Sequence, residues 1–261
     1  MLTTTILFAS GLGIGALGTL IGAGGGWMIV PLLLIGFSFT PQQAVGTSLA
    51  VVFLNAFSGS IAYMLQRRIL YAMGTAFATA TIPGALAGVW MVQYLGSQWF
   101  SVLFGAFLLF IAAFLYRGQK FLSPSVTRLG TSAQHGQFFR SPVMRLGLLL
   151  SFFVGIMSSL FGVGGGIIHV PFLIVILGIP VHTATATSHF VLSITSLTGT
   201  LAFLLQNQVN LPVAASMGLG VLIGAQGGAF LSTRMRSEPI RYILATALTI
   251  FAVRLILRFA F

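Results

Sequence analysis

The decapeptide GAGGGWMIVP at residues 22–31 returns as GVGGGIIHVP at residues 162–171. Each copy places three consecutive glycines before a short apolar run that contains a proline. Because glycine destabilises a helix by about 1 kcal/mol relative to alanine, each copy predicts a break between two helical segments. This break and its repetition 140 residues later divide the chain into two similar halves.

The similarity between the halves extends far beyond the two glycine stretches. At an offset of 140 residues, identical residues recur from one end of each half to the other. The first-half positions concerned are Gly15, Leu20, Gly22, Gly24, Gly25, Gly26, Val30, Pro31, Ala44, Thr47, Ser48, Gly59, Gly84, Gly88 and Ser97. The chain is therefore interpreted as a duplicated unit, which is typical of secondary transporters.

The composition places this duplicated chain in a membrane. Of its 261 residues 57% are hydrophobic and 5% charged, and the mean hydropathy is +1.06. Soluble domains are about 25% charged, and long continuous apolar runs predict membrane-spanning helices rather than the alternating strands of a barrel. The expected fold class is therefore an all-α polytopic membrane protein, with membrane lipid as a partner.

Each half offers five apolar segments, which set the expected domain organisation. The segments cover roughly residues 3–22, 26–37, 42–66, 70–95 and 98–117, and then 146–162, 166–177, 182–206, 210–234 and 238–258. Transmembrane repeat 1 is expected to occupy residues 1–118, a linker residues 119–142, and transmembrane repeat 2 residues 143–261. The N-terminus lacks the basic region and cleavage site of a signal peptide, so it is expected to be a retained first helix.

The basic residues indicate how the two repeats are oriented, because cytoplasmic loops carry an excess of Lys and Arg. Arg67 and Arg68 follow the third segment of the first half, whereas the matching loop QNQVN (206–210) is uncharged. The second half instead carries RMRSEPIR (234–241), one segment later. This exchange predicts two inverted repeats, with a cytoplasmic linker and both chain termini outside an inner, plasma membrane.

The second segment of each half contains about 12 residues, too few to cross a hydrocarbon layer of about 30 Å as a helix. It is interpreted either as a re-entrant half-helix or as one piece of a broken helix. Free N–H groups at such a helix start, next to a glycine nest, can bind an anion. Two inverted copies would direct two such sites at one point near the midplane. The alternative is that the glycines only allow close helix packing.

Polar side chains near the glycines complete the candidate substrate-binding site. Thr47 and Ser48 are repeated as Thr187 and Ser188, although their hydroxyls could instead bond a backbone carbonyl one turn back. His189 and His169 could carry a proton or a positive charge, or simply be hydrogen-bonded between helices. The full candidate set is Gly24, Gly25, Gly26, Thr47, Ser48, Asn55, Gly164, Gly165, Gly166, His169, Thr187, Ser188, His189 and Gln226.

The residue types that are scarce narrow the chemistry further. Glu238 is the single acid against 12 Lys and Arg, and there is no cysteine. A buried carboxylate, which most cation and proton carriers need, is therefore lacking, and an anionic substrate is favoured. No catalytic group, metal ligand set, cofactor or nucleic-acid surface is indicated, and the chain is expected not to be an enzyme. The surplus of positive charge is interpreted as loop charge that sets topology.

The paired stretches GAGGGWMIVPLL and GVGGGIIHVPFL, together with AVGTS (44–48) and HTATATSHF (182–190), resemble the TauE/SafE sulfite-exporter family, also described as the 4-toluene sulfonate uptake permease family. The resemblance covers nearly the whole chain apart from the linker. It implies a permease for sulfite, a sulfonate or another organosulfur oxyanion, and it points to the glycine, Thr and Ser positions given above. An anion channel with the same glycine-lined constriction is the alternative, and the oligomeric state is left open.

Overall fold

The computed structural model describes residues 2–117, 142–232 and 237–260, and all its regular elements there are helices. They are α1 (Leu2–Ile21), α2 (Gly26–Gly36), α3 (Pro41–Leu65), α4 (Tyr71–Val92), α5 (Ser97–Arg117), α6 (Pro142–Phe161), α7 (Gly166–Val175), α8 (Val181–Leu205), α9 (Leu211–Leu231) and α10 (Ser237–Ala260). The ten helices correspond to the ten segments expected from the sequence. The predicted linker, residues 119–142, lies outside the described residues except for its last position.

Six of the described helices are long and apolar enough to cross a membrane: α1, α3, α4, α6, α8 and α9. The outer surface also carries large apolar side chains, among them Trp90, Phe110 and Leu219. In water this exposure would be unfavourable, whereas lipid tails accept it without cost. The all-helical, polytopic fold class expected from the sequence is therefore confirmed.

The chain reverses direction before each of the two short helices, α2 and α7, and these helices then pack mainly on α3 and α8. Gly25, at the start of α2, packs against Ile14 in the middle of α1, and Gly165 packs against Val154 of α6 in the same way. The chain therefore reverses at both glycine turns, and whether each short helix is a re-entrant segment or one piece of a broken helix stays a prediction.

Each repeat packs its first helix against the other repeat. Helix α1 lies along α9 and α6 lies along α4, and backbone meets backbone at small residues. A Cβ atom on Gly224 would lie 2.2 Å from the Leu12 carbonyl oxygen, and one on Gly84 would lie 2.0 Å from that of Phe152. These two contacts are equivalent at the offset of 140 residues. The glycines at four-residue spacing therefore serve close helix packing.

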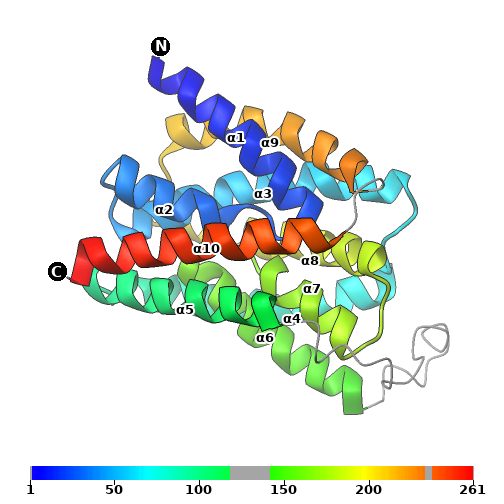
Figure 1. The fold of residues 1–261 in the computed structure, drawn as a ribbon. Helices are drawn as coiled ribbons and strands as arrows, with labels where there is room; N and C mark the ends of the chain where they lie inside the picture. The colour runs from blue at the N-terminus through cyan, green and yellow to red at the C-terminus, as the bar shows by residue number, and fades with distance from the viewer. Residues whose placement is uncertain (1, 118–141, 233–236, 261) are drawn as a thin grey trace.

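The equivalent helices α3 and α8 pair with each other and run antiparallel. Gly46, near the start of α3, contacts Phe203 near the end of α8, and Gly59, near the end of α3, contacts His189 near the start of α8. Helices α5 and α10 likewise lie side by side and run in opposite directions (Figure 1). Contacts between equivalent helices are thus related by a pseudo-two-fold axis perpendicular to the helices.

The backbone repeats as faithfully as the contacts. Positive φ angles occur in matched pairs, at Gly22 and Gly162, Gly24 and Gly164, Ser38 and Gly178, and Arg67 and Asn207. One position breaks the pattern: Gly25 has φ 81°, whereas Gly165 has φ −59°. The two glycine turns therefore share a path but differ at the residue that precedes each short helix.

Candidate functional site

The two glycine turns, residues 22–25 and 162–165, lie in direct contact near the centre of the molecule. A Cβ atom on Gly26 would lie 2.1 Å from the Gly162 carbonyl oxygen, and one on Gly166 would lie 2.0 Å from the Gly22 carbonyl oxygen. Each turn thus places a backbone carbonyl against the first residue of the other turn's helix. Only glycine fits at these two helix starts.

Both helix starts carry buried N–H groups without an acceptor. The Gly25 carbonyl accepts from Met28 and Ile29, and the Gly165 carbonyl accepts from the equivalent pair in α7. Among the described residues, no acceptor is present for the first two N–H groups of either helix, which belong to Gly26, Trp27, Gly166 and Ile167. Because an unpaired buried N–H group is unfavourable, such a helix start offers an anion donors that it otherwise lacks.

Two apolar side chains, Val52 of α3 and Leu192 of α8, lie between the turns and next to both of them. A Cβ atom on Gly24 or on Gly164 would approach these same two side chains within 3.1 Å. Val52 and Leu192 are equivalent residues, so the pseudo-two-fold axis passes between them. In this conformation, both side chains pack against both turns.

A chain of buried polar side chains supports the first turn. The Asn55 amide donates to the Gly24 carbonyl at 3.1 Å, and the Thr19 hydroxyl donates to the Asn55 amide oxygen at 3.1 Å. His189 Nε2 lies 3.3 Å from the Thr19 hydroxyl, and the Tyr63 hydroxyl donates to the Thr19 carbonyl at 2.8 Å. The structure therefore brings together three predicted residues, Gly24, Asn55 and His189, from α3, α8 and the first turn.

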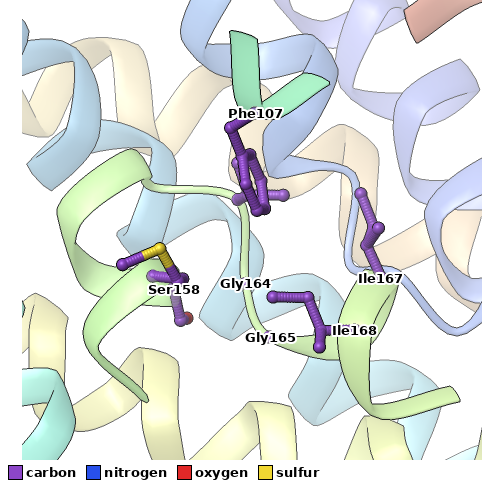
Figure 2. A pocket seen from close by; sticks show the side chains of 8 residues that line it. Phe107, Ser158, Gly164, Gly165, Ile167 and Ile168 are labelled. Carbon is purple, nitrogen blue, oxygen red and sulfur yellow. The ribbon is translucent and has the colours of Figure 1, made fainter. Parts of the chain in front are cut away.

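The second turn borders a crevice that is too narrow for a water molecule in this conformation. Figure 2 shows Phe107 of α5 above the turn and Ser158 of α6 beside it. The residues that line the crevice are Phe107, Met157, Ser158, Val163, Gly164, Gly165, Ile167 and Ile168. The Ser158 side chain is 1% exposed, and its hydroxyl has no hydrogen-bond partner among the described residues. An unpartnered hydroxyl thus lies beside the free N–H groups of α7.

The repeated Thr–Ser pairs have structural partners in three of four cases. Thr47 accepts the backbone N–H of Asn210 at 3.0 Å, and Thr187 accepts that of Leu70 at 3.1 Å. These bonds fix the starts of α9 and α4. Ser48 donates to the Gly162 carbonyl at 2.8 Å, so it braces the second turn. The buried hydroxyl of Ser188 has no hydrogen-bond partner in the part of the chain that the structure describes. A role for these residues in binding substrate stays a prediction.

Two predicted residues lie beside the turns rather than between them. His169 Nε2 lies 3.0 Å from the Ser151 hydroxyl, and its ring stacks on Phe77. Gln226 of α9 donates to the carbonyl and the hydroxyl of Ser58 at 2.8 and 2.9 Å, which ties α9 to α3. Both side chains have the structural partners expected of polar groups between helices, so a role in substrate binding stays a prediction for them too.

The sequence analysis missed three residues of the site: Thr19, Tyr63 and Ser158. A signal existed for two of them. Thr19 and Ser159 are hydroxyl residues at equivalent positions, and Ser158 stands where the first half has Gly18. Tyr63 gave no signal, because its role depends on the way α3 crosses the end of α1.

Comparisons with known proteins agree with the membrane fold. The family model described as Sulfite exporter TauE/SafE matches residues 7–255. The "Probable membrane transporter protein YunE" of Bacillus subtilis is 30% identical over 263 residues, covering 96% of each chain. A "Probable membrane transporter protein" of Methanocaldococcus jannaschii is 26% identical over 272 residues, covering 98% of this chain and 97% of its own. No solved structure matches the chain.

Proposed function

The chain belongs to the sulfite exporter TauE/SafE family, and from that membership and the site we propose that it is a secondary transporter for a small anion. The substrate class we infer is sulfite, a sulfonate or another organosulfur oxyanion. The description of the family supports this class, and the chemistry of the site supports the charge. Membrane transport is the activity named for the relatives, and catalysis plays no part in the proposal.

One observation carries the proposal: two buried helix starts, each with two unpartnered N–H groups, meet at the glycine turns. The positive ends of two helix dipoles favour negative charge there. The whole sequence contains a single acidic residue, Glu238 at the start of α10. The carboxylates that would bind a cation are therefore scarce. A tetrahedral or pyramidal oxyanion has several oxygens that can accept these N–H groups.

The second turn is the better binding position of the two. The Ser158 hydroxyl adds a donor there, and Phe107 and Met157 supply an apolar wall for the part of a substrate that carries no oxygen. The crevice must widen before an anion can enter, because it does not admit water in this conformation. We infer that widening accompanies a relative movement of the two repeats.

The inverted arrangement of the repeats is part of the same proposal. Because α3 and α8 are equivalent, antiparallel and each long enough to cross a membrane, a repeat and its copy would have opposite topology. Such pairs support alternating access around a fixed central site. Basic loops at Arg67, Arg68 and residues 234–241 would then face the cytoplasm together with the linker, in an inner membrane. Reporters fused within the linker and after Phe261 should fall on opposite sides; the same side would rule out inversion.

Flux measurement in proteoliposomes tests the transport proposal. A secondary transporter gives uptake of labelled sulfite or methanesulfonate that saturates with concentration and is inhibited by the other anion. An anion channel instead gives a flux that rises linearly with concentration and carries a conductance. If the vesicles show neither a saturable nor a linear anion flux, both the transporter and the channel are rejected. The reconstituted protein should first be checked for monodispersity, so that an absence of flux is not a failure of folding.

A further inference from the structure

The hydrogen bonds around His189 determine which of its ring nitrogens carries the proton. A carbonyl can only accept, so the Asn55 amide must present its NH₂ group to the Gly24 carbonyl and its oxygen to Thr19. The Thr19 hydroxyl then donates its one proton to that oxygen. His189 Nε2 must therefore be the donor in its 3.3 Å contact with Thr19. The neutral ring is the Nε2–H tautomer.

This tautomer leaves the Nδ1 atom of His189 with a free lone pair in a fully buried position. The side chain is 0% exposed, and among the described residues Nδ1 has no hydrogen-bond partner. Buried polar atoms without a partner are rare, and each needs an explanation. The buried His169 differs, because the Ser151 hydroxyl lies 3.0 Å from its Nε2 atom and neither of its ring nitrogens is among the buried atoms without a partner.

The carbonyl of Gly22 can accept a hydrogen bond from the ring of His189. The backbone of Gly22 lies beside the imidazole, and its carbonyl oxygen also contacts Gly166 at the start of α7. At the equivalent place in the other half, Ser48 donates to the Gly162 carbonyl at 2.8 Å. Ser188 stands where it could make the same bond to Gly22, but its hydroxyl has no hydrogen-bond partner within the described residues. The Gly22 carbonyl is thus open to a donor from His189.

We propose that Nδ1 of His189 binds a proton that is transported together with the anion, one proton for each anion. The proposal rests on the proposed function and adds the coupling ion to it. On protonation, Nδ1 gains the N–H group that donates to the Gly22 carbonyl, and the ring becomes positive beside the α7 start. An anion at the helix starts then stabilises that charge, and by reciprocity the proton raises anion affinity by the same factor. Release of both restores the neutral Nε2–H ring.

Among the described residues, few titratable or charged groups lie on the helices packed against α8. From α3, Tyr63 packs edge-on to His189 at 5.7 Å, with Arg68 just beyond the end of that helix. The other helices packed on α8 contribute Tyr71 of α4, Arg145 of α6 and His169 of α7 as their titratable groups, and α1 and α9 contain none. A carboxylate is not among them, so the balancing negative charge must come from the substrate.

The repeats themselves explain why one site suffices. Leu49 stands in the first half where His189 stands in the second, and it packs on Gly199 as His189 packs on Gly59. Only one of the two equivalent positions can therefore titrate. A single proton site on a pseudo-symmetric carrier gives the transport cycle a fixed stoichiometry.

Calorimetry of the purified full chain with methanesulfonate and with sulfate tests the proposal, because neither probe titrates between about pH 5 and 8. Binding measured in buffers of different ionisation enthalpy should give close to one proton taken up per anion. His189→Gln keeps an amide donor toward Thr19 and removes the titrating nitrogen, so the number of protons that this variant takes up per anion should fall to zero. Its affinity should change less than about twofold per pH unit, against about tenfold for the wild type. His182→Gln, at an exposed position where the first half has Gln42, is the matched control and should behave as the wild type does.

Proton uptake by His189→Gln equal to that of the wild type would overturn the proposal, as would binding to the wild type without any uptake. A variant that binds too weakly for calorimetry is tested by anion uptake into proteoliposomes under an imposed pH gradient. Its residual anion flux should not change with the gradient. Nitrogen-15 spectra of histidine-labelled wild type need no variant: saturating probe should convert one ring to imidazolium, and four unchanged histidines would overturn the assignment. A wild type that neither binds nor transports either probe would instead reject the proposed function.

Discussion

In the first glycine turn the N–H groups of Ala23 and Gly24 both donate to the Gly18 carbonyl, at 2.8 and 3.2 Å. In the second turn Ser158 stands in the place of Gly18, and within the described structure the two corresponding bonds are not made. The first turn is thus closed by its own helix. The second is looser and borders the crevice.

The side chains around the two turns differ as well. The first turn is held by Asn55 and, through Thr19, by His189. At the equivalent positions the second turn has Thr195, whose hydroxyl lies 2.6 Å from that of Thr81, and the apolar Leu49. The two turns thus share a backbone path and differ in these side chains; in our proposal, the first turn holds the proton and the second the anion.

The largest expected effect tests what the turns share. Gly26→Ala and Gly166→Ala should each lower the free energy of unfolding by about 2–4 kcal/mol, because the new Cβ atom would overlap a carbonyl oxygen of the other turn. Thermal unfolding in detergent measures both. Gly13→Ala and Gly227→Ala, where a Cβ atom meets nothing within 4 Å, are the controls and should change stability little. Equal stabilities for all four variants would mean that the turns do not touch in solution.

The next effect tests what distinguishes the turns. Ser158→Gly, which installs the residue of the first half, should weaken sulfate binding by about tenfold to a hundredfold, the value of a hydrogen bond to a charged group of about 1.5–3 kcal/mol. Titration calorimetry gives the affinity. Ser216→Ala, which removes a hydroxyl bonded to its own helix at Pro212, is the control. Unchanged affinity in Ser158→Gly would move the anion away from the second turn.

A smaller difference should separate the two pre-helical glycines. Gly25→Ala forces a left-handed conformation on alanine, whereas Gly165→Ala does not. Because an added Cβ atom would also press on Ile14 or Val154, each variant should be made on a background where that side chain is alanine. There, Gly25→Ala should cost about 1–2 kcal/mol more than Gly165→Ala. Equal costs, measured by thermal unfolding, would show that the two turns have the same backbone.

The smallest effect concerns the repeated threonines. Thr47→Val and Thr187→Val each leave a backbone N–H at the start of α9 or α4 without its acceptor. Both should lose about 1 kcal/mol of stability, since the two bonds are part-buried and water can replace part of each. Anion affinity should be retained. Loss of affinity at unchanged stability would instead support the substrate role that their sequence pattern suggests.

Much of the fold could be predicted because hydropathy and duplication act along the chain. The third segment, expected at 42–66, is the helix Pro41–Leu65, and the glycine stretches do separate long helices from short ones. The sequence did not predict which helices pack against each other. The 140-residue offset implies that if α1 packs on α9 then α6 packs on α4, but it does not choose that pair over another. The choice depends on side-chain shape across the interface.

The candidate site was predictable in its backbone and less so in its side chains. Glycine runs reveal a special conformation directly, so both turns were found. Hydroxyl side chains are ambiguous, because Thr47 bonds a backbone group whereas Ser158 has a free oxygen, and both look alike in sequence. Burial and partners decide between these roles, and they arise only in the folded molecule.

Because α1 packs on α9, its packing surface stays uncovered for much of the synthesis of the chain. The surface that covers α1 is made about 190 residues after α1 itself, which takes roughly 10–40 s at 5–20 residues per second. Over that interval the glycine face of α1, with Gly11 and Gly15, is without its native partner. Helix α6 has no such delay, because its packing partner α4 is synthesised before it. Of the described helices, α1 therefore waits longest for its main partner.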